Sequence, residues 1–473
     1  MSIIRIIINF FFNPLLISVS MPETRRNLLK GMAAGVGAVS MAGCGGDTDG
    51  QNQNQASGES SPDQEDSQIE YWYGFGGSLA ENQQKMIDDF NDNDPPISVD
   101  ATTQGGYIEV YNAVMSGITS GEIADTAQLA VDFGVEQVHD TGAMVPVEDI
   151  MSADQLNQDD LLDPLVGSYS VNDKLQGMPI NSSTPILYYN KDLFGDAGLD
   201  PENPPRTFAG VTQASQQITE NTDVEYGITF PAVAWFIDNW YALQGENLLN
   251  NGNGREGKAT EINLDTSFGR ELFGWIRELS DQGLYDFPGI TAWGQANQIF
   301  TNQESAMLIS STSGVAGNKA SAEEEGFEMG TEYLPSMDDA RTGVCVGGAS
   351  MWVYGDSSHH DTIANFAQHM ASAEQQVFWH KNTGYYPVRK SAVDQLEEEN
   401  WFEENPAFRS AFDQLMESER TNATQGPWMG PSREVRTRLE EAMETAVTSD
   451  TDIDSLLSST KGEIDDILNR YSA

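Results

Sequence analysis

From residue 68 onward, the spacing of apolar and polar residues first fits a strand and then fits a helix. Residues 68–75 are aromatic and β-favouring, which is typical of a strand. A glycine turn separates them from residues 79–91, where Met86, Ile87 and Phe90 recur at helical spacing. The pattern predicts a strand, a tight turn and a helix.

The same order repeats immediately afterwards. Residues 97–103 predict a strand, and residues 107–118 predict a helix with one apolar face. Residues 127–133 read as another buried strand that ends at Asp132. An alternation of strands and helices predicts a mostly parallel α/β sheet.

Clusters of hydroxyl and glycine residues lie next to several later strands. Ser310–Gly314 follows an apolar run, and Gly347–Ser350 precedes another. Two helices, near residues 435–447 and 453–471, are predicted to close the chain. Ligands of open α/β sheets bind outside the carboxyl ends of strands, so these loops are expected to meet in one cleft.

The central stretch, residues 177–194, organises the rest of the chain. Pro179 and Pro185 disfavour helix before them, so the polar run Asn-Ser-Ser-Thr between them is expected to be extended or looped. Residues 186–189 form a short β-favouring run, and the Asn-Lys-Asp that follows suits the start of a helix. A polar segment therefore leads into a buried strand.

This stretch resembles the segment of extracellular solute-binding proteins of ABC importers that joins their two lobes. The match is closest to the glycerol-3-phosphate-binding members, which share Asn-Ser-Ser-Thr-Pro followed by Leu-Tyr-Tyr-Asn-Lys-Asp. The resemblance extends over nearly all of residues 69–471. It implies an α/β, two-lobed, periplasmic-binding-protein-like fold of type II, with the lobes joined by a multi-crossing hinge that closes on a ligand.

The expected division follows from that resemblance. The first lobe is predicted to comprise residues 68–183 and 310–386. The second lobe is predicted to comprise residues 184–309 and 387–473.

The first 67 residues predict export and anchoring. Arg25-Arg26 precedes a short apolar run that ends in Met-Ala-Gly-Cys44, which resembles a twin-arginine lipoprotein signal (residues 1–44) with lipidation at Cys44. Translation is expected to start at Met21, because a further apolar run precedes the arginines. Residues 45–67 are polar enough to predict a disordered tether.

Arg436 is the sharpest site candidate. It stands near the start of a helix opened by Gly-Pro-Ser, where its guanidinium and free backbone N–H groups could face one anion. From the local sequence alone, a surface arginine paired with Glu440 is equally compatible. The resemblance favours the first interpretation, because it implies a phosphate-contacting arginine at this position.

Further site residues are implied by the resemblance. Aromatic faces can stack on polyol or sugar C–H surfaces, and acids can accept bonds from ligand hydroxyls. Asp132 stands where the family commonly has a glutamate, which leaves the ligand's identity open. The other residues that match the family's ligand contacts are Tyr107, Ser182, Ser183, Trp235, Ser313, Gly348 and Tyr385.

The amino-acid composition limits the kinds of partner that the protein can bind. The chain has 73 acidic and 24 basic residues and a formal charge of −49, which argues against nucleic acid. This balance favours adaptation to salty surroundings, where a Debye length of about 3 Å limits repulsion between acids. The two cysteines cannot form a disulfide framework. The five histidines show no metal-binding spacing, so no metal or cofactor is expected.

Taken together, the sequence predicts a non-enzymatic, exported, monomeric binding protein held by lipid at the outer face of the cytoplasmic membrane. Its expected ligand is glycerol-3-phosphate or a glycerophosphodiester, and its expected partners are the permease subunits of an ABC importer. A neutral sugar or oligosaccharide is the alternative ligand. An exported glycoside hydrolase is the alternative from another class, and it requires two carboxylates facing each other across the cleft.

Overall fold

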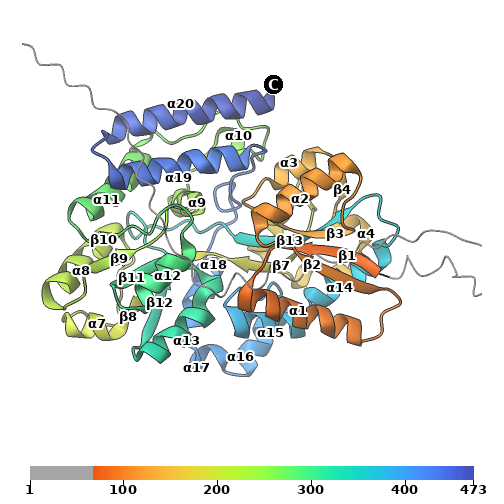
Figure 1. The fold of residues 1–473 in the computed structure, drawn as a ribbon, viewed down its shortest axis with the longest axis horizontal. Helices are drawn as coiled ribbons and strands as arrows, with labels where there is room; N and C mark the ends of the chain where they lie inside the picture. Colours follow the sequence, from red (N-terminus) through yellow and green to blue (C-terminus); the bar gives the residue numbers. More distant parts are fainter. Residues whose placement is uncertain (1–67) are drawn as a thin grey trace, which may run out of the picture. The chain divides into compact units, whose positions relative to one another are not determined.

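The computed structural model describes residues 68–473, which contain two β-sheets with helices around each (Figure 1). The first sheet has the strand order β2-β1-β3-β13-β4, and β7 also pairs with β13. Strands β1, β2 and β3 run parallel to one another, as the alternating pattern predicts. Strand β13 runs antiparallel to its neighbours, because the chain re-enters this sheet from the other lobe. The strands are β1 (Gln68–Tyr73), β2 (Ser98–Thr103), β3 (Thr126–Ala130), β4 (Met144–Val145), β7 (Met178–Ser183) and β13 (Gly347–Tyr354).

The second sheet has the order β10-β9-β11-β8-β12. Strands β9, β10 and β11 are parallel, whereas β8 is antiparallel to both β11 and β12. A small hairpin, β5 (Ser170–Val171) with β6 (Lys174–Leu175), lies outside both sheets. The strands of the second sheet are β8 (Pro185–Asn190), β9 (Tyr226–Thr229), β10 (Tyr285–Asp286), β11 (Ser305–Ser311) and β12 (Met329–Tyr333).

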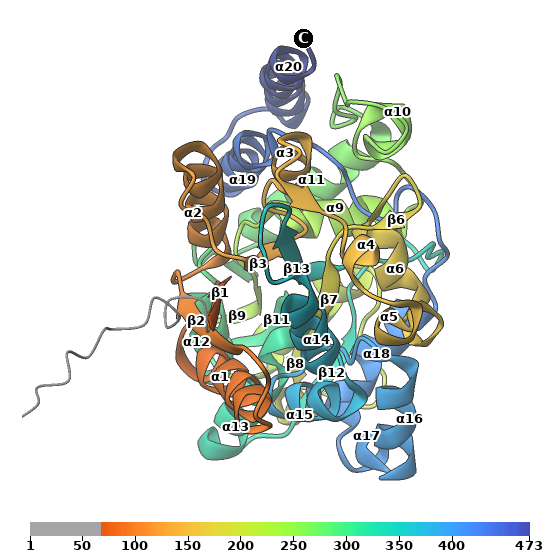
Figure 2. The ribbon, with the colours of Figure 1, turned by 90° about the vertical axis from the view of Figure 1, so that its right-hand side faces the viewer.

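The helices around the first sheet complete the first lobe (Figure 2). Helix α1 buries Met86, Ile87 and Phe90, the residues that carry its helical periodicity. Residues 360–383 form two helices, because Ser372 caps a new start by accepting a hydrogen bond from the N–H of Gln375. The helices are α1 (Gly77–Asp92), α2 (Tyr107–Ser120), α3 (Val135–Asp140), α4 (Val147–Ile150), α5 (Ala153–Leu156), α6 (Asp163–Tyr169), α14 (His360–Met370) and α15 (Ala373–Thr383), with a 3₁₀ turn at Gln158–Asp160.

The second lobe is built on the second sheet. Its C-terminal helices α19 and α20 pack against each other and against α11, and α19 also packs on α9. The predicted closing helices are therefore present: α19 starts three residues earlier and ends one residue later than expected, and α20 ends one residue later. The helices are α7 (Lys191–Asp196), α8 (Phe208–Asn221), α9 (Ala234–Leu243), α10 (Asn250–Asn253), α11 (Ser267–Asp281), α12 (Trp293–Thr301), α13 (Val315–Glu325), α18 (Arg409–Met416), α19 (Ser432–Thr448) and α20 (Ile453–Ser472), with a 3₁₀ turn at Thr312–Gly314.

The chain crosses between the sheets where β7 ends and β8 begins, with Thr184 between them. This is the crossing that the sequence predicts next to Pro185. Of the two conformations expected for the Asn-Ser-Ser run, the extended one is confirmed. It forms the end of β7 and is fully buried, because Gly347 and Gly348 of β13 pair with Ser183 and Ser182.

The predicted return to the first lobe at residue 310 is wrong. After β11 the chain continues through α13 into β12, which pairs with β8 in the second sheet. It re-enters the first sheet only at β13. The Ser310–Gly314 cluster lies at the end of β11 and in the turn after it, within the second lobe. The final predicted segment also begins differently. Helix α16 (Lys390–Glu398) packs on α15 and α17 (Trp401–Glu404) follows, and this segment reaches β12 with the 3₁₀ turn at Pro406–Phe408 and with α18.

Candidate functional site

A cavity of about 350 Å³ lies between the two lobes, and we call it the interlobe cavity. Residues from the loops beside β1, β3 and β13 form one wall. Residues from α9, α12, α19 and the turn after β11 form the other. Its lining comprises Gly74, Phe75, Leu79, Gly106, Tyr107, Asp132, Phe133, Ser183, Val233, Trp235, Thr291, Trp293, Asn297, Ser310, Ser311, Ser313, Gly314, Gly347, Gly348, Tyr385, Arg436 and Glu440.

The cavity brings together residues that lie far apart in the sequence. All but one of the side chains or backbones that sequence analysis singles out for ligand contact are in its lining. The exception is Ser182, which is fully buried and whose hydroxyl lies 3.2 Å from the hydroxyl of Tyr169. Successive side chains of a strand point to opposite faces, so Ser183 faces the cavity and Ser182 does not.

Arg436 lies on α19 with only 5% of its surface exposed. Its Nη2 donates a 2.8 Å hydrogen bond to Oδ2 of Asp238 on α9. Burial alone would lower the pKa of this guanidinium, but Asp238 and Asp132 raise it, so the group stays charged. The alternative of a surface arginine paired with Glu440 is therefore wrong.

The unsatisfied atoms of Arg436 are its most informative feature. Its Nε and Nη1 have no hydrogen-bond partner among residues 68–473, although both atoms are buried. Buried N–H donors without a partner cost about 1–3 kcal/mol each, and charged groups cost more. Because Arg436 also lines the cavity, a ligand acceptor there would remove this cost.

Three carboxyl groups surround this single arginine. Burial raises the pKa of Asp132 to about 6, against the opposing effect of Arg436. Burial raises the pKa of Glu440 to about 7, although the backbone N–H of Ala234 donates to it at 3.3 Å. Burial also raises the pKa of Asp238, again opposed by Arg436. Asp132 and Glu440 can therefore gain or lose a proton close to neutral pH.

Aromatic side chains supply most of the remaining surface. The hydroxyls of Tyr107 and Tyr385 lie 3.2 Å apart, and Nδ2 of Asn181 donates to Tyr107 at 2.7 Å. On the opposite wall Trp235 packs beside Trp293, with ring centroids 6.4 Å apart. The indole N–H of Trp235 has no partner among the described residues. The walls can thus stack on C–H surfaces and also offer hydrogen bonds.

His380 supports Tyr385 from behind. Its ring is buried, and Nδ1 lies 2.8 Å from the backbone carbonyl of Tyr385. Burial lowers the pKa of His380 to about 4, so the ring is neutral at physiological pH and donates from Nδ1 to that carbonyl. This contact fixes the turn that carries Tyr385 into the cavity.

Sequence reasoning missed several lining or supporting residues. Phe75, Trp293 and Asn297 line the cavity, whereas Asp238 orients Arg436 from behind it. Glu440 entered the sequence analysis only as a surface partner for Arg436. The one available signal was its position four residues after Arg436, which places both on the same face of α19.

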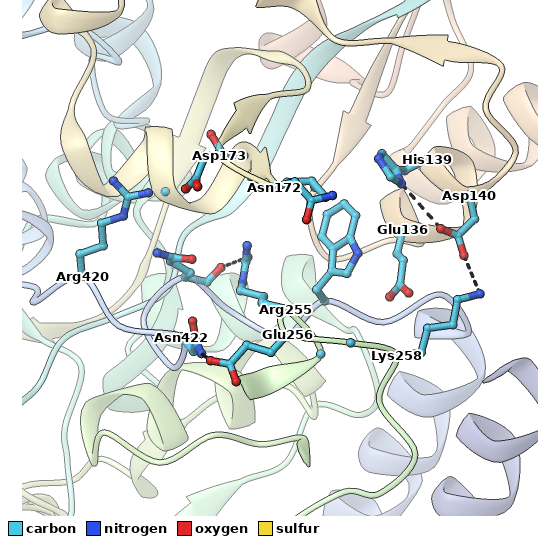
Figure 3. Close-up of a pocket in the computed structure, with 17 residues that line it drawn as sticks. Glu136, His139, Asp140, Asn172, Asp173, Arg255, Glu256, Lys258, Arg420 and Asn422 are labelled. Atoms are coloured by element: carbon cyan, nitrogen blue, oxygen red, sulfur yellow. Dashed lines mark hydrogen bonds and ion pairs between the residues drawn. The ribbon is translucent and has the colours of Figure 1, made fainter. Parts of the chain in front are cut away.

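A second, more open hollow of about 660 Å³ lies at the outer rim of the contact between the lobes, and we call it the rim groove (Figure 3). Its lining is mostly charged or amide-bearing. It comprises Glu136, His139, Asp140, Gly167, Ser170, Val171, Asn172, Asp173, Gly254, Arg255, Glu256, Gly257, Lys258, Arg420, Asn422, Gln425 and Trp428. Figure 3 shows Lys258 reaching toward Asp140 at one end of this groove.

Residues 68–473 hold no group of three or more His, Cys, Asp or Glu side chains that could bind a metal ion. Over the same residues, none of the helices has the length and apolar character needed to cross a bilayer. Cys44 lies outside the described residues.

Two α/β lobes with a small polar and aromatic cavity between them define a solute-binding protein of the two-lobed type. Consistent with this, a sequence model of the bacterial extracellular solute-binding proteins matches residues 85–410, and the chain belongs to that family.

Individual relatives agree with this membership. The chain is 26% identical over 390 residues to the sn-glycerol-3-phosphate-binding periplasmic protein UgpB of Escherichia coli strain K12, covering 80% of this chain and 87% of that protein. The counterpart in Shigella flexneri serotype 5b is 27% identical over the same length. These relatives are named as binding proteins, and the chain has the solute-binding role of its family.

Solved structures share the fold. UgpB from Mycobacterium tuberculosis, crystallised with glycerophosphocholine, is 21% identical, with a TM-score of 0.70 over 86% of this chain and 99% of that one. The GacH receptor of Streptomyces glaucescens, studied with acarbose, is 19% identical, with a TM-score of 0.71 over 85% and 98%. At these identities the likeness establishes a two-lobed α/β fold of type II and leaves the ligand open.

Proposed function

We propose that the protein captures glycerol-3-phosphate or a glycerophosphodiester between its lobes and delivers it to the permease of an ABC importer. The observation that carries the proposal is the buried guanidinium of Arg436, which lines the cavity with Nε and Nη1 unsatisfied. A phosphate oxygen is an acceptor that this group binds strongly. The sequence relatives named for glycerol-3-phosphate binding support the same ligand class.

The three carboxyl groups near Arg436 set a condition on phosphate binding. If all were ionised, an incoming phosphate would meet more negative than positive charge. Asp132 and Glu440 have pKa values of about 6 and 7, so each can take up a proton as the anion approaches. Protonated, they become hydrogen-bond donors to the ligand. Anion capture is therefore coupled to proton uptake.

The strongly acidic exterior is compatible with an anionic ligand. Charges separated by more than a Debye length of about 8 Å at physiological salt are largely screened, and in saltier media that length is shorter. A contact in a buried cavity is screened much less. The phosphate therefore interacts mainly with Arg436 and its immediate neighbours.

A neutral sugar or oligosaccharide is the second candidate. The observation that favours it is the pairing of aromatic walls, Trp235 with Trp293 and Tyr107 with Tyr385, with the acceptors Asp132 and Glu440. Aromatic faces stack on sugar C–H surfaces, and carboxylates accept from sugar hydroxyls. A glycoside hydrolase is not favoured, because the relatives are binding proteins.

A thermal-shift and calorimetry panel separates the candidates. Glycerol-3-phosphate, glycerophosphocholine and maltose are added to the purified protein in high salt, because a ligand that binds only the native state raises Tm. A rise with the two phosphates and not with maltose supports the proposal. A rise with maltose alone replaces it by the sugar assignment, and turnover of a glycoside would establish an enzyme.

Variants test the role of Arg436 directly. Removing Arg436 alone leaves Asp238 buried and unpaired, so the informative variant is the double change Arg436→Gln with Asp238→Asn. It should abolish phosphate binding while the protein stays folded. Arg433→Ala is the matched control, because Arg433 is exposed and one turn earlier on the same helix. Retained phosphate affinity in the double variant would contradict the proposal.

We also propose that the protein is exported through a twin-arginine signal and held by lipid on Cys44 at the outer face of the cytoplasmic membrane, with residues 45–67 as a tether and the body monomeric. The order of the arginine pair, the apolar run and the small residues before Cys44 supports this. Cys44→Ser should release the protein from membranes. Mass spectrometry of the precursor tests a start at Met21.

The acidic surface supports a further part of the proposal, adaptation to high salt. We expect the protein to lose stability as salt is removed, because repulsion among acids is then less screened. Refolding in low salt measures this, and full stability without added salt would contradict it.

A further inference from the structure

The carboxylate of Asp140 joins the two lobes at the rim groove. It lies at the end of α3 in the first lobe, whose Val135 and Val138 pack with α2 and β3. From the second lobe, Nζ of Lys258 approaches it at 3.0 Å and the hydroxyl of Tyr471 donates to it at 2.9 Å. The two donors come from the loop after α10 and from the last turn of α20, so one carboxylate binds two separate segments of the other lobe.

The second-lobe side of this contact is held in place by its own packing. Nζ of Lys258 lies 4.7 Å from the centre of the Tyr471 ring, a cation–π arrangement. The same ring packs against the backbone of Gly430, where a Cβ atom would lie 2.0 Å from it. A glycine is therefore required at residue 430. Lys258 and Tyr471 therefore contact each other as well as Asp140.

Helix α3 connects this contact to the interlobe cavity. The helix starts directly after Asp132, Phe133 and Gly134, and the first two line the cavity. Between the two lobes, the hydroxyl of Ser432 donates to the carbonyl of Asp132 at 2.9 Å and accepts from the N–H of Gly134 at 3.2 Å. Ser432 is the first residue of α19, the helix that carries Arg436. The start of α3 is thus tied to α19, and its end is tied to Lys258 and Tyr471.

We propose that Asp140, Lys258 and Tyr471 form a clasp, here called the rim clasp, that holds the lobes closed and positions Asp132 in the interlobe cavity. Asp140 is a positioning residue, because it touches the ligand site only through α3. The rim clasp rests on the proposed function only in requiring that the lobes close on a ligand, and it is independent of which ligand is bound.

The rim clasp is weak enough for the lobes to open and close reversibly. Lys258 and Asp140 are 48% and 31% exposed, and ion pairs of such exposure contribute little. Two other ionisable side chains lie close to this pair. Glu136 lies beside Asp140 and Lys258, and His139 approaches Asp140 at 3.6 Å. Losing the rim clasp should shift the ratio of closed to open molecules by about two- to fivefold, which leaves the protein folded.

Hydrogen exchange on the ligand-free protein tests the rim clasp without any assumption about the ligand. In Asp140→Asn the amide of Gly134 should exchange about two- to fivefold faster than in the wild type, because it is protected by Ser432 of the other lobe. Asp149→Asn is the matched control. Its exposed ion pair with Lys174 joins α4 and β6 within the first lobe, and its loss should leave the Gly134 amide unchanged.

Two further measurements distinguish closure from general destabilisation. Tyr471→Phe removes one hydrogen bond without a change of charge and should give a smaller effect in the same direction. Small-angle X-ray scattering should give a larger radius of gyration for Asp140→Asn than for Asp149→Asn. The difference should shrink as salt is raised within the range where circular dichroism shows an intact fold, because salt screens the ion pair.

Equal exchange and scattering for the Asp140 and Asp149 variants would overturn the proposal. Faster exchange over the whole chain would also overturn it, because that result assigns Asp140 a role in global stability only. If the Gly134 effect is seen but no phosphate or sugar binds, the rim clasp stands and the ligand assignment fails.

Discussion

The interlobe cavity and the rim groove both lie between the lobes, but they differ in how far their charged side chains are exposed to water. In the cavity, the Arg436 and Asp238 side chains are 6% and 1% exposed. In the groove, the Lys258 and Asp140 side chains are 48% and 31% exposed. A buried charge that loses its partner is severely destabilising, whereas an exposed pair contributes little. The cavity is therefore suited to fixed ligand chemistry, and the groove to an adjustable contact.

The largest expected effect tests this difference in stability directly. Arg436→Ala should lower the free energy of unfolding by ~3–5 kcal/mol, because Asp238 stays buried without its partner. Asp140→Asn should change it by less than ~1 kcal/mol. Denaturant unfolding of both variants at one salt concentration measures the two values. Similar losses in the two variants would mean that burial does not separate the regions.

A second prediction concerns the shape of the cavity wall. A Cβ atom at Gly347 would lie 2.6 Å from the ring of Trp235. That ring packs beside Phe236 and Trp293 and has little room to move. Gly347→Ala should therefore cost ~1–3 kcal/mol of stability and weaken ligand binding. Adding Trp235→Phe should recover part of the stability, and a failure to recover any would place the strain elsewhere.

The pH dependence of binding sharpens the comparison further. Asp132 and Glu440 have pKa values of about 6 and 7, and a bound phosphate raises both further. Binding then takes up protons, so affinity is highest below pH 6 and falls as pH rises through 6 to 8, by up to about tenfold per pH unit for each proton taken up. Calorimetry with glycerophosphocholine measures this, because its phosphodiester has no second proton to lose. Asp132→Asn should flatten the part of the profile near pH 6.

The stability of the ligand-free protein also depends on the protonation of Asp132. The pKa of Asp132 is raised in the folded state above its ordinary value of 3.8. The stability contributed by its protonated form is fully present below pH 3.8 and is lost as pH rises through about 6. Asp132→Asn should therefore remove that loss. An unchanged stability profile in the variant would contradict the burial of this carboxyl.

Much of this arrangement could be predicted from the sequence. The alternating strands and helices predicted the α/β class, and the segment around Pro185 predicted the first crossing between lobes. The position of hydroxyl and glycine loops beside strands predicted a single cleft, but the individual cavity residues were named from the resemblance to the family. The resemblance to the family supplied the roles that local patterns alone left open, above all that of Arg436.

The rest depends on contacts between distant segments. Asp238 on α9 looked like one acid among many, and only the packing of α9 on α19 brings it to Arg436. The return to the first lobe was expected at residue 310 but lies at β13, because β12 pairs with the distant strand β8. Asp140, Lys258 and Tyr471 are single residues separated by more than a hundred positions, and no local pattern joins them.

The smallest expected effect lies where the two regions meet. The hydroxyl of Ser432 bonds the carbonyl of Asp132 and the N–H of Gly134, between the cavity and the rim clasp. Hydrogen bonds of this kind contribute about 0.5–1.5 kcal/mol. Ser432→Ala should therefore weaken ligand binding by about threefold to tenfold with little change in Tm.

Ser410→Ala is the control, because its 3.0 Å bond to Thr331 lies within the second lobe. If both variants bind the ligand equally well, the contact of Ser432 with Asp132 and Gly134 contributes nothing to ligand binding. If Ser432→Ala weakens binding and Asp140→Asn adds no further loss to it, the two contacts act through one closure step.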